Sequence, residues 1–218
     1  MEITLRDAAG MLTGQPEAAA IPWIETIPAE PGQPERQNTA YIKGTALFKE
    51  DKMIGRINES TTKGVLFLRD EMNTATVTVP LEGTNGAVSV EIARSHTVLV
   101  PRIKGNKWYM LVQIKAQGSI IQNTTTMDLS KPDNTAVLES GLKESLNKLV
   151  TMTLDQVQKK MKTDIFFFGE AFHNKYPAAF NKVKSRWSEV FPQIEAVVEA
   201  DVKVLRPGLN STDAKINK

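Results

Sequence analysis

The residue types that most often carry catalysis are scarce in this chain and lie far apart. His96 and His173 are its only two histidines, and it contains no cysteine. A zinc-binding histidine needs further ligands at short, regular spacing, and neither histidine has such a partner nearby in the sequence. The pattern predicts two surface histidines and no metal site.

Two segments match the Ser-x-x-Lys pattern, in which a lysine can activate a serine nucleophile. They pair Ser140 with Lys143 and Ser145 with Lys148. In acyl-enzymes this motif is accompanied by Ser-Asp-Asn and Lys-Thr-Gly motifs, and neither occurs here. Both pairs fall inside a predicted long helix, so we interpret them as its solvated face.

Several carboxylates could act as general acids or bases. They are Glu139, Glu144 and Asp155 in the predicted long helix and Glu199 and Asp201 in the last predicted strand. The last two alternate with valines, so we expect them on the solvent face of the strand. A catalytic pair needs one desolvated carboxyl with a raised pKa, which this pattern does not provide. The sequence thus predicts no catalytic, cofactor-binding or metal-binding residue, and a protein that is not an enzyme.

The composition argues against several further classes of function. A formal net charge of +2, with Lys and Arg scattered among Asp and Glu, argues against a nucleic-acid partner. The absence of cysteine excludes thiolate nucleophiles, disulfides and iron–sulfur ligation. No uncharged apolar stretch approaches the roughly 18 residues of a spanning helix. The first residues lack the basic segment and apolar run of a signal peptide.

Local patterns divide the chain into two groups of elements. The first half reads as a helix over 5–12, an edge strand over 21–27, a proline-rich loop over 28–34, a hairpin of 41–48 with 53–57, and a short helix over 61–69. The second half reads as strands over 75–79, 88–92, 98–103 and 108–115, a long helix from Pro132 to about Met161, a helix over 177–187 and a strand over 195–205.

Because strands come in groups followed by helices and one further strand, the order predicts an α+β fold. We expect antiparallel sheets with a long helix and shorter helices packed on one face. The predicted domains are residues 1–72, a smaller α+β unit, and 73–210, the larger one, with a flexible tail over 211–218. The Phe-rich segment 166–172 is either an exposed patch or part of the core, and helical spacing of Phe168 and Phe172 favours the core.

Two blocks of sequence are similar to a known family. The first, residues 43–68, contains Gly-Thr-Ala-Leu-Phe-Lys-Glu-Asp-Lys-Met-Ile-Gly; the second, residues 157–169, ends in Thr-Asp-Ile-Phe-Phe-Phe-Gly and precedes a Trp-Ser-Glu-Val-Phe-Pro segment. In order and distance they resemble the C-terminal region of the Ger(x)C family, the C subunits of spore germinant receptors. The resemblance covers roughly residues 38–209.

The resemblance implies a non-enzymatic receptor subunit beside the A and B subunits at the outer face of the spore inner membrane. Members of the family are lipoproteins with a lipidated cysteine, so this chain would be a soluble part without the lipid anchor. The family offers no catalytic residues to carry over. Its motif positions are expected to form turns, a cap and a core anchor, namely Gly44, Gly55, Asp164, Gly169 and Trp187.

Two hypotheses of function remain open from the sequence. In the first, the chain is a scaffold that docks onto other germination proteins, which predicts shallow surfaces with an exposed apolar patch. In the second, it is a small-ligand (nutrient) binding module or an enzyme of unrecognised type, which predicts a deep apolar pocket with converging polar groups. The family resemblance and the missing chemistry favour the scaffold.

Overall fold

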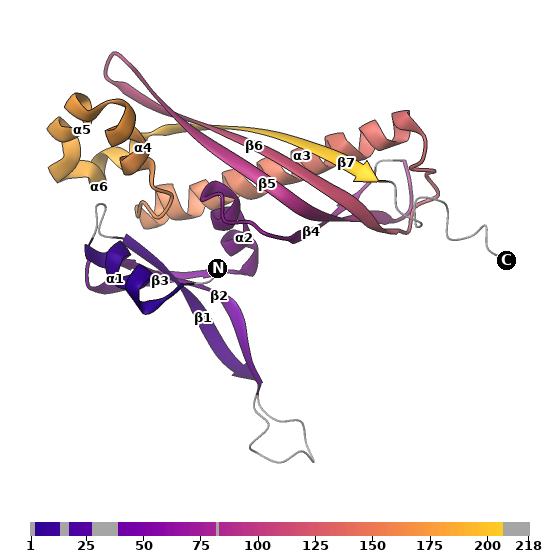
Figure 1. Ribbon diagram of the computed structural model, residues 1–218, viewed down its shortest axis with the longest axis horizontal. Coiled ribbons are helices and arrows are strands. Elements are labelled where there is room, and N and C mark those ends of the chain that lie inside the picture. Colours follow the sequence, from indigo (N-terminus) through magenta and orange to yellow (C-terminus); the bar gives the residue numbers. More distant parts are fainter. Residues whose placement is uncertain (1–2, 14–17, 28–38, 82, 207–218) are drawn as a thin grey trace.

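The computed structural model describes residues 3–13, 18–27, 39–81 and 83–206 (Figure 1). The proline-rich loop predicted over 28–34 and the tail predicted over 211–218 lie outside these residues. The elements form two separate sheets, one of three strands and one of four. The long helix and the short helical segments that follow it accompany the larger sheet, whereas the first helix lies against the smaller one.

The first sheet is antiparallel and has the order β1-β2-β3. It is built from β1 (Ala18–Ile27), β2 (Thr39–Lys49) and β3 (Lys52–Asn58), and it follows α1 (Leu5–Thr13). β1 lies at the edge, as Pro22 predicted. The turn between β2 and β3 places Glu50 at a φ of 55°, in the left-handed region that reverses a chain tightly.

Helix α2 (Glu59–Leu68) connects the first sheet to the second half of the chain. The Asn58 side chain caps its start by accepting a hydrogen bond from the Thr61 N–H at 2.9 Å. Val65, Phe67 and Leu68 are buried in the same hydrophobic cluster as the core of the second sheet. The predicted helix over 61–69 is confirmed within two residues.

The second sheet has the order β4-β5-β6-β7. Its strands are β4 (Ala75–Pro80), β5 (Ala87–Lys104), β6 (Lys107–Asn123) and β7 (Glu195–Arg206). The segments predicted as separate strands over 88–92 and 98–103 form the single strand β5. The extra residue Ala93, between the pairs Ile92–Gly118 and Arg94–Gln117, shifts the alternation of β5, which is why the sequence pattern broke between the two predicted strands. The pairing of β6 with β7 is parallel, a feature that the sequence pattern did not predict.

Helix α3 (Pro132–Leu154) runs along the second sheet, as Figure 1 shows. Its buried side chains recur at intervals of four residues: Leu138, Leu142, Leu146, Val150 and Leu154. A π-helical turn, η1 (Asp155–Met161), continues the helix until Lys162 ends it with a φ of 53°. The predicted long helix is confirmed, and the π-helical geometry of its last turns is a feature of the structure alone.

Polar side chains of α3 cover the outer edge of β7. The Asn147 side chain accepts a hydrogen bond from the Ala200 N–H at 3.1 Å, and Glu139 accepts one from the Val204 N–H at 2.9 Å. The free N–H groups of an edge strand otherwise invite pairing with another chain. Glu139, which the sequence offered as a free carboxylate, therefore has a structural partner.

Five short helical segments fill the space between η1 and β7. They are α4 (Phe168–Lys175), α5 (Pro177–Val183), η2 (Lys184–Arg186), α6 (Trp187–Val190) and η3 (Phe191–Gln193). The buried Gln158 side chain of η1 donates hydrogen bonds to the carbonyl oxygens of Phe191 and Ile194, both at 2.9 Å. These bonds fix the end of the helical segment just before β7 begins.

The predicted fold class, α+β with antiparallel sheets, a long helix and shorter helices, is confirmed. The boundary predicted near Met72 falls in the connection between α2 and β4. Whether residues 1–72 and 73–210 are separate domains stays a prediction.

Gly64 lies at a close contact between α2 and α3, and it supplies a first test of the fold. A Cβ atom added there would overlap the Oγ1 atom of Thr153. We expect Gly64→Ala to lower the free energy of unfolding by about 2 kcal/mol because of overpacking, measured by urea denaturation.

The matched control is Gly10→Ala in α1, where, apart from the neighbouring residues and backbone of the helix itself, no described atom lies within 4 Å of the added Cβ. Because alanine favours helix over glycine, this change should instead add up to about 1 kcal/mol. Equal effects of the two substitutions would contradict the assigned packing of α2 on α3.

Candidate functional site

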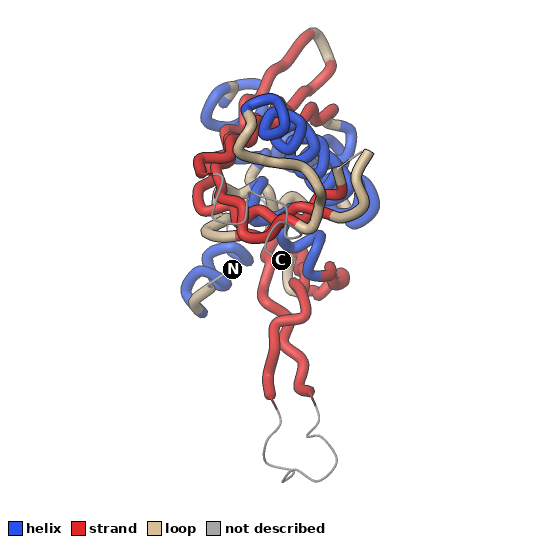
Figure 2. The backbone as a smooth tube through the Cα atoms, turned by 90° about the vertical axis from the view of Figure 1, so that its right-hand side faces the viewer, coloured by secondary structure: helices blue, strands red, loops and turns tan. Residues whose placement is uncertain are grey.

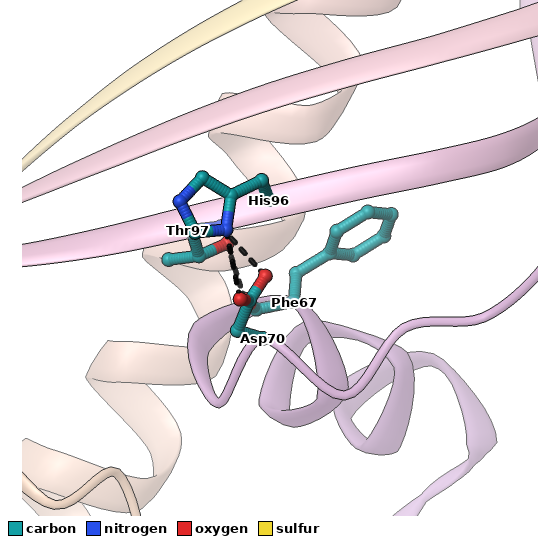
Figure 3. Close-up of polar contacts among 4 residues, drawn as sticks. All are labelled: Phe67, Asp70, His96 and Thr97. Carbon is teal, nitrogen blue, oxygen red and sulfur yellow. Dashed lines mark hydrogen bonds and ion pairs between the residues drawn. The ribbon is translucent and has the colours of Figure 1, made fainter.

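The residues that the sequence offered for chemistry do not come together. His96 lies on β5, where its Nδ1 is 2.9 Å from the carboxylate of Asp70 (Figure 3). Asp70 also accepts a hydrogen bond from the Thr97 N–H at 2.7 Å, and the Thr97 hydroxyl donates to the Phe67 carbonyl at 2.6 Å. This group joins the end of α2 to β5. It is a structural contact, and Asp70 is a partner that sequence spacing could not identify.

The remaining candidates are also dispersed. His173 is exposed on α4 and stacks on Phe180 at 5.3 Å between ring centroids. Ser140 and Lys143 are exposed on α3, and Lys148 is exposed one turn further along the helix. The predicted solvated helix face is therefore confirmed for these side chains.

The carboxylates of the last strand also face solvent. Glu199 and Asp201 are both exposed, as their alternation with valines predicted, and Glu199 accepts a hydrogen bond from Gln113 at 3.1 Å. Within the described residues no three His, Asp or Glu side chains gather closely enough to hold a metal ion. None of the helices in the described part of the chain is long and apolar enough to cross a membrane.

The most elaborate polar centre is the buried carboxylate of Asp164, which is 4% exposed. Its Oδ1 accepts hydrogen bonds from the N–H groups of Phe166 at 3.3 Å and Phe168 at 3.1 Å. Its Oδ2 accepts from the Gly169 N–H at 2.7 Å and from the indole Nε1–H of Trp187 at 2.9 Å. The carboxylate thus caps the start of α4 and joins it to α6.

Burial raises the pKa of the Asp164 carboxyl above its ordinary value, because an ionised group loses its hydration inside the protein. The four N–H donors favour the ionised form and oppose this rise, but burial has the larger effect. A raised pKa marks functional carboxyls in many enzymes. Here each carboxylate oxygen already has two donors, so the group is explained by its structural role.

An aromatic cluster surrounds this centre. The Trp187 ring lies edge-on to Phe180 at 5.2 Å, and Trp108 of β6 lies 4.6 Å from Phe172 between ring centroids. Phe166, Phe168 and Phe172 are fully buried, which confirms the prediction that the Phe-rich segment belongs to the core. Phe167 is half-buried, and the Arg69 guanidinium lies 4.6 Å from its ring centroid.

The motif glycines owe their identity to close approaches within elements. Gly169 lies where an added Cβ would be 3.1 Å from Trp187 Nε1, so it lets the indole reach Asp164. Gly44 and Gly55 were predicted in turns, and that prediction was wrong. They lie within β2 and β3, where an added Cβ would overlap the Ile57 carbonyl oxygen and approach Met161 respectively.

A two-stranded ribbon formed by β1 and β2 is a distinctive feature of the surface. β3 pairs with β2 only from Gly44 onward, so residues 24–27 of β1 pair with residues 39–42 of β2 alone, and Lys43 is the extra residue at the base of this ribbon. Figure 2 shows this ribbon extending away from the rest of the molecule. Ile24 and Ile42 are direct cross-strand partners and are 58% and 60% exposed. Ile27 and Tyr41 add further exposed apolar surface.

The two-sheet α+β arrangement with its long helix is a known fold. It matches the crystal structure of the GerBC protein with a TM-score of 0.78 over 94% of this chain and 61% of that chain, at 19% sequence identity. Residues 43–208 match the family described as "Spore germination B3/ GerAC like, C-terminal". The chain therefore belongs to this family of spore germination proteins.

Two of the relatives that this chain matches come from Bacillus subtilis (strain 168). The spore germination protein KC is 24% identical over 99% of this chain and 55% of its own length. The spore germination protein YndF is also 24% identical, over 87% of this chain and 46% of its own length. This chain thus spans about half the length of the relatives it matches.

The stability of the fold should depend strongly on the Asp164 carboxylate. Asp164→Ala leaves three backbone N–H groups and the Trp187 indole N–H buried without an acceptor. We expect the free energy of unfolding to fall by about 3–5 kcal/mol, measured by urea denaturation, with a loss of near-UV circular dichroism from the aromatic cluster.

The control is Asp128→Ala. Asp128 accepts hydrogen bonds from the Ser130 N–H and hydroxyl, but these contacts are exposed. Its loss should cost less than about 1 kcal/mol. A similar loss of unfolding free energy at both positions would show that the buried hydrogen bonds of Asp164 stabilise the fold no more than the exposed ones of Asp128.

The raised pKa of Asp164 also predicts a pH dependence. Because the folded protein holds this proton more tightly, the contribution of the group to stability is fully present below the unfolded pKa of about 3.9 and is lost as the pH rises through the folded pKa. The difference in unfolding free energy between the wild type and Asp164→Ala should therefore shrink as the pH is raised from about 4 to 7. If this difference in unfolding free energy grows over the same pH range, the pKa of Asp164 is lowered in the folded protein and not raised.

Proposed function

We propose that this chain acts in spore germination as a non-enzymatic interaction subunit of a nutrient germinant receptor. The family membership supports a role in germination, and the names of the relatives refer to that process. The proposed partners are the A and B subunits of the receptor, at the outer face of the spore inner membrane. We also propose that the intact protein carries a lipid anchor. The anchor would hold the protein at the membrane, and the residues described here would bind the A and B subunits.

The observation that carries the proposal is the exposed ribbon formed by residues 24–27 and 39–43. A two-stranded hairpin without a third strand or a helix packed on it is only marginally stable in water. Exposed apolar side chains that sit together on a projecting element are typical of protein-docking surfaces. The Ile24–Ile42 pair offers two β-branched side chains that a partner could bury.

The first sheet supports the ribbon at its base. The ribbon continues strands of the first sheet, whose inner residues Ala20 and Leu47 are fully buried. A rigid base lets an exposed ribbon present its side chains in a fixed orientation, which lowers the entropy lost on binding. An ion pair between Lys43 and Glu25, 2.6 Å apart, ties the two ribbon strands together near that base.

The test is affinity capture of the receptor subunits from solubilised spore membranes of the source organism, with this chain as bait. The double variant Ile24→Ser/Ile42→Ser should recover the A and B subunits about tenfold less well than the wild type. Because both side chains are exposed, the variant should fold normally and lose only about 0.5–1 kcal/mol of stability.

The matched control is Val98→Ser, which removes another exposed β-branched side chain, 42% exposed, from β5 in the second sheet. It should leave capture unchanged. If the wild-type chain captures neither subunit, or if the ribbon variant captures both as well as the wild type, the ribbon is not the docking element.

A further inference from the structure

A small cavity lies where the first sheet meets the short helices before β7. Its volume is about 270 Å³. Lys49 and Glu50 contribute from the end of β2 and the following turn, Lys162 from the end of η1, and Lys184 from η2. Both halves of the chain thus form its walls.

The rim of this cavity, which we call the lysine cavity, is rich in positive charge. Lys49, Lys162 and Lys184 come from three separate segments of the chain. Within the described residues no carboxylate forms an ion pair with any of the three ammonium groups. Like charges around a concave surface reinforce one another and attract anions into it.

The negative groups at the lysine cavity compensate this charge only in part. Glu50 is exposed at the tip of its turn. Asp164 lies at the cavity wall, but it is 4% exposed and all four of its hydrogen bonds go to N–H groups of the protein.

Hydroxyl groups add neutral donors beside the lysines. Ser185 and Ser188 line the same cavity from η2 and α6, and both are exposed. Ammonium and hydroxyl donors together are the groups that bind the oxygens of carboxylates and phosphates. The volume lies below the roughly 300–1,000 Å³ of pockets for drug-sized ligands, so the ligand must be small.

We propose that the lysine cavity is a binding site for a small oxyanion, either a carboxylate or a phosphate group. The bound anion contacts residues of the first sheet, η1 and the short helices at once. It therefore ties the two halves of the chain together and stabilises their relative placement. This site is separate from the ribbon, so the inference stands independently of the proposed docking function.

The experiment is a titration of the whole 218-residue chain with sodium phosphate and, separately, with sodium acetate, followed by amide NMR spectra. Sodium chloride keeps the ionic strength constant, so that general screening of surface charge does not contribute. We expect saturable shifts of the Ser185 and Ser188 amide signals with at least one of the two anions. The anion that binds more tightly identifies the ligand class.

Two variants test whether the lysines of the cavity bind the anion. Lys184→Gln and Lys49→Gln should each weaken the anion affinity by about tenfold, because each removes one charge-assisted contact. Lys182→Gln is the control, since Lys182 is an exposed lysine of neighbouring α5 that does not line the cavity. It should change the affinity less than about twofold.

Three results would overturn the proposal. The first is the absence of saturation with both anions up to about 10 mM, which corresponds to binding too weak to be specific. The second is a pattern of shifts spread over lysines across the whole surface. The third is an equal loss of affinity in Lys182→Gln and Lys184→Gln.

Discussion

The carboxylate of Asp164 holds together the part of the molecule on which the remaining packing depends. It accepts hydrogen bonds from three backbone N–H groups at the start of α4 and from the Trp187 indole. An unpaired carboxylate in this place would be costly to bury, and four unpaired donors would be costly too. Each therefore requires the other, and the bonds bring α6 and its tryptophan over α4 in one defined arrangement.

This centre organises a continuous core that extends through both halves of the chain. Trp187 and Phe172 contact Trp108 of β6, and the same cluster of buried side chains reaches Leu47 of β2. The contact of Gly64 with Thr153 adds a close helix crossing, and Asp70 and Thr97 join the end of α2 to β5. The first contact fixes the position of α2 against α3, and the second fixes its end against β5.

Two surface features of the protein differ in shape and charge. The ribbon is apolar and projects from the first sheet, whereas the lysine cavity is concave and positively charged. By contrast, the outer edge of β7 is closed by Asn147 and Glu139 of α3. The structure thus covers one sheet edge that would otherwise invite pairing, while it leaves the Ile24–Ile42 pair open to a partner.

The sequence by itself determined the elements whose periodicity is local. The leucine spacing of α3, the alternation in β7 and the burial of Phe168 and Phe172 all follow from the residues, and so does the α+β class. Only the tertiary structure decided which groups meet. The bonds of Asp164 to Trp187, the parallel pairing of β7 with β6 and the convergence of three lysines join residues that are distant in sequence. No local pattern encodes such contacts, because they arise from long-range packing of side chains whose partners the spacing does not specify.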